Sequence, residues 1–261
     1  MMPVSDPAQI YETHLVPAIF GPLAQILTER AQPRPAEQVL DVACGTGVVA
    51  RSIARRVGST GRIVGLDFDP LMIAKARQLA PGIEWQEGDA QRLPIADMAF
   101  DLVLCQQGLQ FMPDRAAGLS EMHRVLRPGG RVALAIWTEL SKSPGQAMLF
   151  GTLGARLGID MSQPLPWSLA NEAQVLKLVS TAGFVDIVSS VASLQARFPS
   201  GRRFVEILID GSSRMTRHAL AQIPADERAA FIDEVAGRLR AYERPSGLEL
   251  PMETRIIIGR K

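Results

Sequence analysis

The chain has 261 residues, of which 47% are hydrophobic and 21% charged, a composition typical of a globular protein and not of a disordered one. Its 28 Lys and Arg residues nearly balance 27 Asp and Glu residues, for a net charge of +1, which argues against a nucleic-acid-binding protein because affinity for polyanions needs a basic surface. The two cysteines, the absence of an apolar run near the roughly 20 residues of a membrane span, and the lack of a secretion signal predict a cytoplasmic protein.

The first predicted element is a helix from Asp6 to Ala31, which Pro17 and Pro22 divide, and a linker with two prolines follows it. Short apolar strands then alternate with helices. The strands are expected at 39–43, 63–67, 83–86, 102–105 and 131–137, and the helices at 48–57, 70–80 and 115–126, the last ended by the breaker cluster RPGG. This alternation predicts right-handed crossovers and a mainly parallel sheet.

The alternation weakens after Trp137. Helices are expected at 145–157, 171–182, 202–212 and 225–242, and strands, placed at the sheet edges, at 184–191 and 254–258. The fold class is therefore α/β, a doubly wound, Rossmann-like, mainly parallel seven-stranded sheet with helices on both faces and a helical cap at about 195–245. We expect one domain over 1–261, with a helical cover at 1–36, a ligand-binding core at 37–140, and the remaining sheet edge and cap at 141–261.

The central motif is VLDVACGTGVVA, from Val39 to Ala50. Gly45 and Gly47 allow a tight turn between strand and helix and the close approach of a ligand. Asp67, 20 residues beyond Gly47, is expected to end the second strand, where its carboxylate could accept hydrogen bonds from a ribose diol. This spacing alone is a weak signal and leaves open which nucleotide binds.

Asp41 favours one nucleotide over the other. It lies four residues before the first glycine, where a carboxylate would repel the pyrophosphate of NAD by roughly 4 kcal/mol at 4 Å and an effective dielectric of 20. The same carboxylate attracts an ammonium group. S-adenosylmethionine carries an amino acid and a sulfonium and no phosphate, so the charge pattern favours it.

Five motifs in one register extend this interpretation. They are VLDVACGTG, GLDFDP, EGDAQRLPIADMAFDLVLC, QQGLQFMPD and EMHRVLRPGGRVALAIW, which together cover Val39 to Trp137. The sequence resembles the class I S-adenosylmethionine-dependent methyltransferases (methyltransferase type 11 domain), in the small-molecule branch of the ubiquinone and menaquinone C-methyltransferases.

The resemblance implies roles for particular residues. The implied cofactor-binding residues are Asp41, Ala43, Gly45, Gly47, Asp67, Phe68, Met72, Asp89, Ala90 and Gln106. Among these, Asp41 would orient the amino group, Asp67 would hold the ribose hydroxyls and Asp89 would accept from the adenine amino group. Phe68 and Met72 would flank the adenine, although ordinary core packing explains both residues equally well.

The implied reaction is in-line transfer of a methyl group to a small, largely apolar acceptor, with S-adenosylhomocysteine as the product. Catalysis would come mainly from alignment, and a general base is needed only if the proton of the acceptor must leave early. His14, Tyr11 and Gln107 are candidate catalytic residues, and Gln107 and Gln110 could hydrogen-bond the acceptor. The predicted apolar wall of the acceptor site consists of Phe150, Trp167, Phe204, Ile207 and Leu208.

Two other functions stay open: a NAD-dependent oxidoreductase, and a non-catalytic module that binds S-adenosylmethionine. No metal site is expected, because Cys44 and Cys105 lack further ligands and are typical of small buried hydrophobes. The expected partner is a small-molecule acceptor, with no nucleic acid and no membrane span. The sequence leaves open the acceptor atom, the pathway and the oligomeric state, a homodimer included.

Overall fold

A computed structural model describes residues 6–161, 165–212 and 214–261 of the chain. Contacts divide the chain into two compact units. Unit 1 consists of Met1–Pro22, Glu139–Pro164 and Ser193–Glu253, and unit 2 consists of Leu23–Thr138, Leu165–Ala192 and Thr254–Lys261. Unit 2 therefore contains the whole segment that carries the five motifs.

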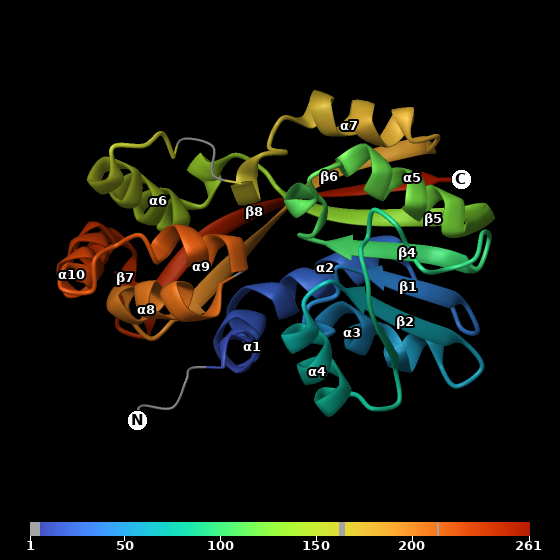
Figure 1. The fold of residues 1–261 in the computed structure, drawn as a ribbon, viewed down its shortest axis with the longest axis horizontal. Helices are drawn as coiled ribbons and strands as arrows, with labels where there is room; N and C mark the ends of the chain where they lie inside the picture. Colours follow the sequence, from blue (N-terminus) through green and yellow to red (C-terminus); the bar gives the residue numbers. More distant parts are fainter. Residues whose placement is uncertain (1–5, 162–164, 213) are drawn as a thin grey trace. The chain divides into compact units, whose positions relative to one another are not determined.

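The sheet has eight strands, numbered here in chain order. They are β1 (Gln38–Val42), β2 (Arg62–Asp67), β3 (Glu84–Glu87), β4 (Phe100–Gln106), β5 (Leu126–Trp137), β6 (Val185–Phe198), β7 (Glu243–Arg244) and β8 (Gly247–Arg260). Their order is β3-β2-β1-β4-β5-β8-β6, with β7 paired to β8 (Figure 1). The pairs from β3 to β5 are parallel, whereas β8 runs antiparallel to β5. The predicted α/β class and the mainly parallel sheet are confirmed.

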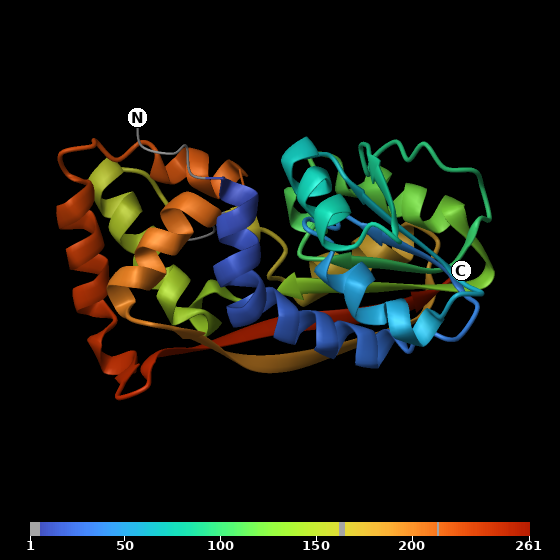
Figure 2. The ribbon, with the colours of Figure 1, turned by 90° about the horizontal axis from the view of Figure 1, so that it is seen from below.

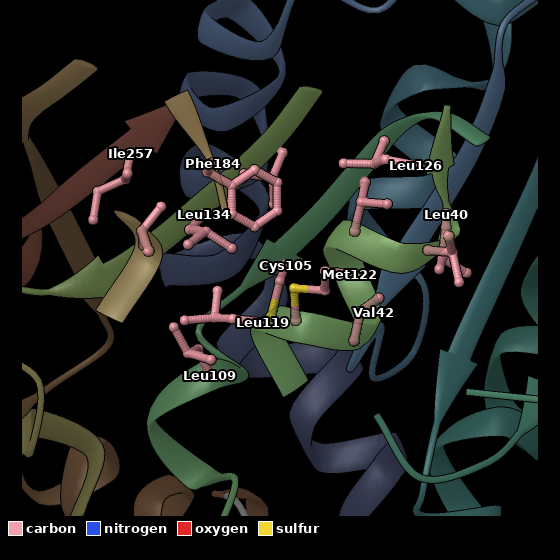
Figure 3. Close-up of a cluster of buried hydrophobic side chains, with 14 of the residues drawn as sticks. Leu40, Val42, Cys105, Leu109, Leu119, Met122, Leu126, Leu134, Phe184 and Ile257 are labelled. Atoms are coloured by element: carbon pink, nitrogen blue, oxygen red, sulfur yellow. The ribbon is translucent and has the colours of Figure 1, made fainter. Parts of the chain in front are cut away.

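Helices lie on both faces of the sheet in unit 2. They are α2 (Gly21–Ala31), α3 (Val48–Val57), α4 (Pro70–Leu79), α5 (Arg115–Val125) and α7 (Glu172–Thr181), with short 3-10 helices η2 (Leu109–Phe111) and η4 (Leu165–Trp167). One cluster of buried side chains joins α3 and α4 to Trp85 of β3. A larger cluster on the other face joins α5 and α7 to the strands, and Figure 3 shows Leu119 and Met122 of α5 beside Cys105 of β4. The alternation of side chains along each strand separates these two clusters.

Unit 1 is mainly helical. Its elements are α1 (Pro7–Ile10), the π-helix η1 (Tyr11–Phe20), η3 (Leu140–Lys142), α6 (Pro144–Leu157), α8 (Gly201–Gly211), α9 (Arg214–Leu220), α10 (Arg228–Arg238) and η5 (Arg240–Tyr242). Helix α8 packs against α1 and α10, and α10 packs against α6 (Figure 2). Phe204 and Phe231 are fully buried in this helical core. Arg156 of α6 pairs with Glu227 and Glu234 next to α10 and within it.

Several elements differ from the sequence-based expectation. The RPGG cluster does not precede a strand but lies inside β5, where a register shift between Phe100 and Leu102 of β4 accommodates the extra residues. Strand β8 is not an edge, because it lies between β5 and β6. The eighth strand, β7, and helix α9 had no clear signal in the sequence.

The N-terminal helix is also not broken at its prolines. Pro17 lies inside the π-helix, whose wider turns include a hydrogen bond from the N–H of Gly21 to the carbonyl of Val16. A proline removes one backbone donor and clashes with the preceding turn of an α-helix, and a π-helical stretch is one way of accommodating it. The helical path then continues into α2.

Candidate functional site

The turn between β1 and α3 depends on glycine residues, which have no side chains. Gly45 and Gly47 have φ angles of 56° and 82°, in the left-handed region that favours glycine. A Cβ atom on Gly47 would lie 2.1 Å from the Trp85 ring, and one on Gly65 would lie 2.3 Å from the same ring. The indole therefore supports the turn from beneath, and it is fixed by a hydrogen bond of 2.9 Å from its Nε1 to the carbonyl of Ala80.

Asp41 is a buried carboxylate below this turn. Its exposed fraction is 1%. One oxygen, Oδ2, accepts a hydrogen bond of 3.0 Å from the N–H of Ala50, in the first turn of α3. The other oxygen, Oδ1, has no hydrogen-bond partner within the described part of the chain. Burial, reinforced by the negative charge of Asp67 and partly opposed by the Ala50 bond, raises the pKa of Asp41 to about 7.

Asp67 ends β2 and supports the turn from the other side. Its Oδ2 accepts from the N–H of Gly45 at 2.8 Å, and its Oδ1 accepts from the N–H of Asp69 at 2.9 Å. Burial raises the pKa of Asp67 above its ordinary value, although these backbone hydrogen bonds oppose the shift. The residue therefore organises the glycine turn in addition to any contact with a ligand.

The remaining predicted cofactor residues lie at the ends of the neighbouring strands. Asp89 follows β3, is exposed and accepts hydrogen bonds from Gln91, which lower its pKa. Ala90 next to it is half-buried. Phe68, directly after Asp67, is 60% exposed and so is not a core residue, whereas Met72 is 8% exposed and is counted among the buried residues of the core.

The segment after β4 packs against the glycine turn. Gln106 is the last residue of β4, and Gln107 has a φ of 56° and donates its N–H to the carbonyl of Ala135 at 2.8 Å. A Cβ on Gly108 would lie 2.5 Å from the Cβ of Ala43. Parallel strands that end at one edge thus bring Asp41, Asp67 and Gln106 to the same side of unit 2.

The three candidate catalytic residues fall in different units. Tyr11 and His14 are half-buried residues of η1 in unit 1, and the Tyr11 ring stacks on Phe20 with a centroid distance of 4.9 Å. Gln107 belongs to unit 2, where its side chain bonds to Thr254 and Gln110. No local pattern in the sequence points to Thr254, because this residue lies 147 positions from Gln107.

The residues of the predicted apolar wall are core residues of their units. Phe150, Phe204, Ile207 and Leu208 are at most 6% exposed within unit 1. Trp167 of unit 2 is 4% exposed and stacks on Trp137 with a centroid distance of 6.1 Å. Their packing role is therefore established, whereas a contact with the acceptor stays a prediction.

The two cysteines are small buried side chains, as expected. Both Cys44 and Cys105 are free thiols, and burial raises the pKa of Cys105 to about 12. Within 6–161, 165–212 and 214–261, no cluster of three His, Cys, Asp or Glu side chains is suited to a metal ion. The helices in those same ranges are all too short or too polar to cross a bilayer.

Comparison with known proteins agrees with this geometry. Residues 39–130 match a family model described as a methyltransferase domain. Over 115 residues the chain is 41% identical to the chloroplastic 2-phytyl-1,4-beta-naphthoquinone methyltransferase of Arabidopsis thaliana, an alignment that covers 41% of this chain and 44% of that protein. Over 120 residues it is 41% identical to the demethylmenaquinone methyltransferase of Lysinibacillus sphaericus, covering 45% and 51% of the two chains. The alignments thus span about half the length of these relatives.

A solved structure shares the fold over most of the chain. The crystal structure of a putative methyltransferase from Bacillus halodurans superposes with a TM-score of 0.60 and 21% sequence identity, covering 91% of this chain and 98% of that one. At this level of identity the likeness shows the fold alone. The family model covers the strands and turns that carry Asp41, Asp67 and Gln106.

Proposed function

We propose that the chain is a class I, S-adenosylmethionine-dependent methyltransferase, which the match of residues 39–130 to a methyltransferase domain supports, and that it transfers a methyl group to a small, largely apolar acceptor. The observation that carries the proposal is the buried carboxylate of Asp41, one oxygen of which has no partner within the described residues. A buried acceptor of this kind calls for a cationic donor.

The site fits the amino-acid end of S-adenosylmethionine. An ammonium group near Asp41 would give its Oδ1 a donor and supply the missing counter-charge. The first turn of α3 is already occupied by this carboxylate through the N–H of Ala50, which makes the turn unsuitable for a diphosphate. The same charge argument disfavours NAD.

The nucleoside end fits the strand ends beside the turn. The carboxylate of Asp67 is held by two backbone N–H groups and retains further lone pairs for the ribose hydroxyls. Phe68 offers an exposed aromatic surface for the adenine. Asp89, exposed after the end of β3, would accept a hydrogen bond from the adenine amino group. The N–H of Ala90 would donate a hydrogen bond to the adenine.

Catalysis in this proposal is alignment. S-adenosylmethionine supplies a methyl group already activated by the positive charge on sulfur. The chain contributes rigid placement by the glycine turn and the carboxyl ends of β1, β2 and β4, and alignment of reactants can be worth roughly 7–11 kcal/mol. The Gln107 amide does not titrate, so Gln107 acts by orienting other groups and not as a base.

We propose a quinone-type ring compound as the acceptor class. The support comes from the relatives, which are named for naphthoquinone and menaquinone methylation. We further propose a cytoplasmic protein, supported by the two free thiols, and a homodimer, supported by the exposed Val185, Val188 and Val191 on β6, a strand at the edge of the sheet.

Calorimetry tests the cofactor assignment. The wild-type protein is expected to bind S-adenosylhomocysteine and not NAD, and Asp67→Ala is expected to lose that binding. Asp101→Ala is the matched control, because Asp101 also accepts from a backbone N–H, that of Gln38 at 2.8 Å, but at the opposite end of the strands. Preferential binding of NAD, or unchanged affinity in Asp67→Ala, would refute the proposal. A metabolite screen with labelled methyl donor then identifies the acceptor and tests for a non-catalytic module.

A further inference from the structure

A chain of hydrogen bonds between side chains runs through the buried interior of unit 2 beside the proposed cofactor site. The Oγ1 of Thr254 bonds to the carbonyl oxygen of Ile136 at 3.0 Å. The Nε2 of Gln107 donates to Thr254 Oγ1 at 3.1 Å, and the Nε2 of Gln110 donates to Gln107 Oε1 at 2.7 Å. Thr254, Gln107 and Gln110 are 0%, 6% and 0% exposed, so the chain is shielded from solvent.

The donors and acceptors in this series of hydrogen bonds can be arranged in only one direction. The carbonyl of Ile136 can only accept, so the single hydroxyl proton of Thr254 is committed to it. Thr254 must then accept from an N–H of Gln107, which turns the carbonyl oxygen of Gln107 toward Gln110. Gln110 must in turn present its own NH2 group to Gln107. Reversing the amide of Gln110 would place its oxygen against the oxygen of Gln107. Reversing the amide of Gln107 would require the Thr254 hydroxyl to donate to Gln107, which leaves the contact with Ile136 without a proton.

This direction leaves one hydrogen-bond acceptor, the side-chain oxygen of Gln110, at the end of the series that is opposite to Ile136. The Oε1 of Gln110 is buried and has no hydrogen-bond partner within the described residues. A buried carbonyl that lacks a donor is costly, and such atoms are rare in folded proteins. The group that completes this series of hydrogen bonds must therefore be a hydrogen-bond donor, such as a hydroxyl. An ether or ketone oxygen has no proton to donate to the Oε1 of Gln110.

The elements around Gln110 carry two aromatic side chains. Gln110 lies in η2, which packs against η4. Trp167 of η4 stacks on Trp137. Arg115 ties the two 3-10 helices together, because its Nη2 donates to the Ser168 hydroxyl at 2.7 Å and to the carbonyl of Gln110 at 3.3 Å.

We propose that Gln110 determines the specificity of the reaction by accepting a hydrogen bond from a ring hydroxyl of the methyl acceptor, so that the protein takes phenols or hydroquinones and rejects the corresponding ethers. This inference rests on the proposed methyl transfer. Gln107 and Thr254 are positioning residues, which fix the orientation of the Gln110 amide. The cofactor amine does not need this acceptor, because Asp41 is available to it.

A pair of probes that differ only in the hydroxyl hydrogen tests the inference. The protein is saturated with S-adenosylhomocysteine and titrated with 1-naphthol or with 1-methoxynaphthalene. We expect the wild-type protein to bind 1-naphthol about tenfold more tightly than the ether. Gln110→Met should lose about tenfold in affinity for 1-naphthol and bind the ether unchanged. Failure of S-adenosylhomocysteine to bind would refute the proposed function itself, whereas the probes test Gln110 alone.

Thr254, at the other end of this series of hydrogen bonds, provides an independent variant. Thr254→Val removes the hydroxyl that orients Gln107 and should reduce the preference for 1-naphthol, while Thr254→Ser should restore it. Thr28→Val is the control, because Thr28 is another buried threonine of unit 2, whose hydroxyl donates to the carbonyl of Gln25 at 3.0 Å, and this variant should keep the full preference. Equal binding of both probes to the wild type, absence of 1-naphthol binding, or weaker S-adenosylhomocysteine binding in Gln110→Met would overturn the inference.

Discussion

The carboxylate of Asp41 in β1 accepts a hydrogen bond from the N–H of Ala50 in α3, nine residues later, at a distance of 3.0 Å. The strand before the glycine turn thus caps the helix after it. The favourable interaction of a negative charge with a helix N-terminus is opposed by complete burial, and burial dominates, because the pKa of Asp41 is raised to about 7. The carboxylate is consequently only half ionised at neutral pH.

This pKa predicts the pH dependence of cofactor binding. An ammonium group prefers the ionised carboxylate, so binding below pH 7 must displace a proton from Asp41. S-adenosylhomocysteine should bind about tenfold more tightly at pH 8 than at pH 6, as ionisation of one group with this pKa requires. Calorimetry at the two pH values measures the ratio, and Asp41→Asn should remove it. Equal affinities in the wild-type protein would contradict the assignment of Asp41.

The same residue should make the free protein less stable at higher pH. The pKa of Asp41 is raised in the folded state from its ordinary value near 4 to about 7, so the folded state binds the proton more tightly than the unfolded state. The contribution of Asp41 to stability is therefore greatest at low pH and falls as the pH rises from about 4 to 7, by up to about 4 kcal/mol. The pKa of Asp67, raised by burial, acts in the same direction. Urea unfolding at pH 5.5 and pH 8 should show the decrease, and Asp41→Asn should show a smaller one.

The contact of two glycines with Trp85 predicts the cost of adding a methyl group. Gly65→Ala should destabilise the fold by about 1–3 kcal/mol, because its Cβ would overlap the indole. Gly47→Ala should cost more, because its φ of 82° adds backbone strain. Urea unfolding measures both.

A double variant and a control make this prediction specific. Gly65→Ala combined with Trp85→Leu should be less destabilised than the sum of the two single changes, because the shorter side chain makes room for the methyl group. Gly151→Ala, in α6 with no atom within 4 Å of the added Cβ, should be neutral or stabilising by about 0.5–1 kcal/mol. Strict additivity at positions 65 and 85 would show that the indole is not the obstacle.

The half-buried ion pair between Arg131 and Glu37 predicts a larger stability loss than an exposed pair does. Their closest atoms are 2.7 Å apart, with side-chain exposures of 15% and 11%. Burial of Glu37 would raise its pKa, but the hydrogen bonds from Arg131 and from the N–H of Arg34 outweigh burial and lower it. Arg131→Met should cost about 1–3 kcal/mol, because it leaves the half-buried carboxylate of Glu37 without its charged partner.

The exposed pair between Arg62 and Glu84 provides the comparison for Arg131. Its atoms are equally close, at 2.7 Å, but its side chains are 45% and 41% exposed. Arg62→Met should therefore change the free energy of unfolding by less than about 1 kcal/mol. Similar losses in the two variants, measured by urea unfolding, would show that burial does not set the strength of the Arg131 pair.

Local signals in the sequence were sufficient for most of the fold. Helix α3 has the predicted bounds, since Gly47 and Gly58 mark its two ends, and Asp69 and Asn171 cap α4 and α7 as their side chains suggest. The places of Asp41 and Asp67 beside the glycine turn were predicted, whereas their hydrogen bonds to the N–H groups of Ala50 and Gly45 were not. Hydrophobic periodicity and capping depend on residues that are only a few positions apart, so helices and strands can be predicted from them without knowledge of distant contacts.

Long-range relationships could not be read in this way. The bond between Gln107 and Thr254 joins residues 147 positions apart, and Trp85 meets Gly47 across two strands. Glycine and proline in the RPGG cluster predict a break in local structure, yet Leu126 and Arg131 on either side of the cluster both pair with β4, and a shift of register keeps the cluster within β5. The division into two units likewise depends on contacts between distant segments.

The place of β8 has a consequence for how the polypeptide is synthesised. During translation, β5 and β6 leave the ribosome before the strand that separates them in the finished sheet. Until then, β5 has an open edge on the side that β8 will fill, and unpaired edges of this kind favour association with other nascent chains. Deleting the last few codons should therefore lower the soluble yield in cells more sharply than deleting the first few codons after the start.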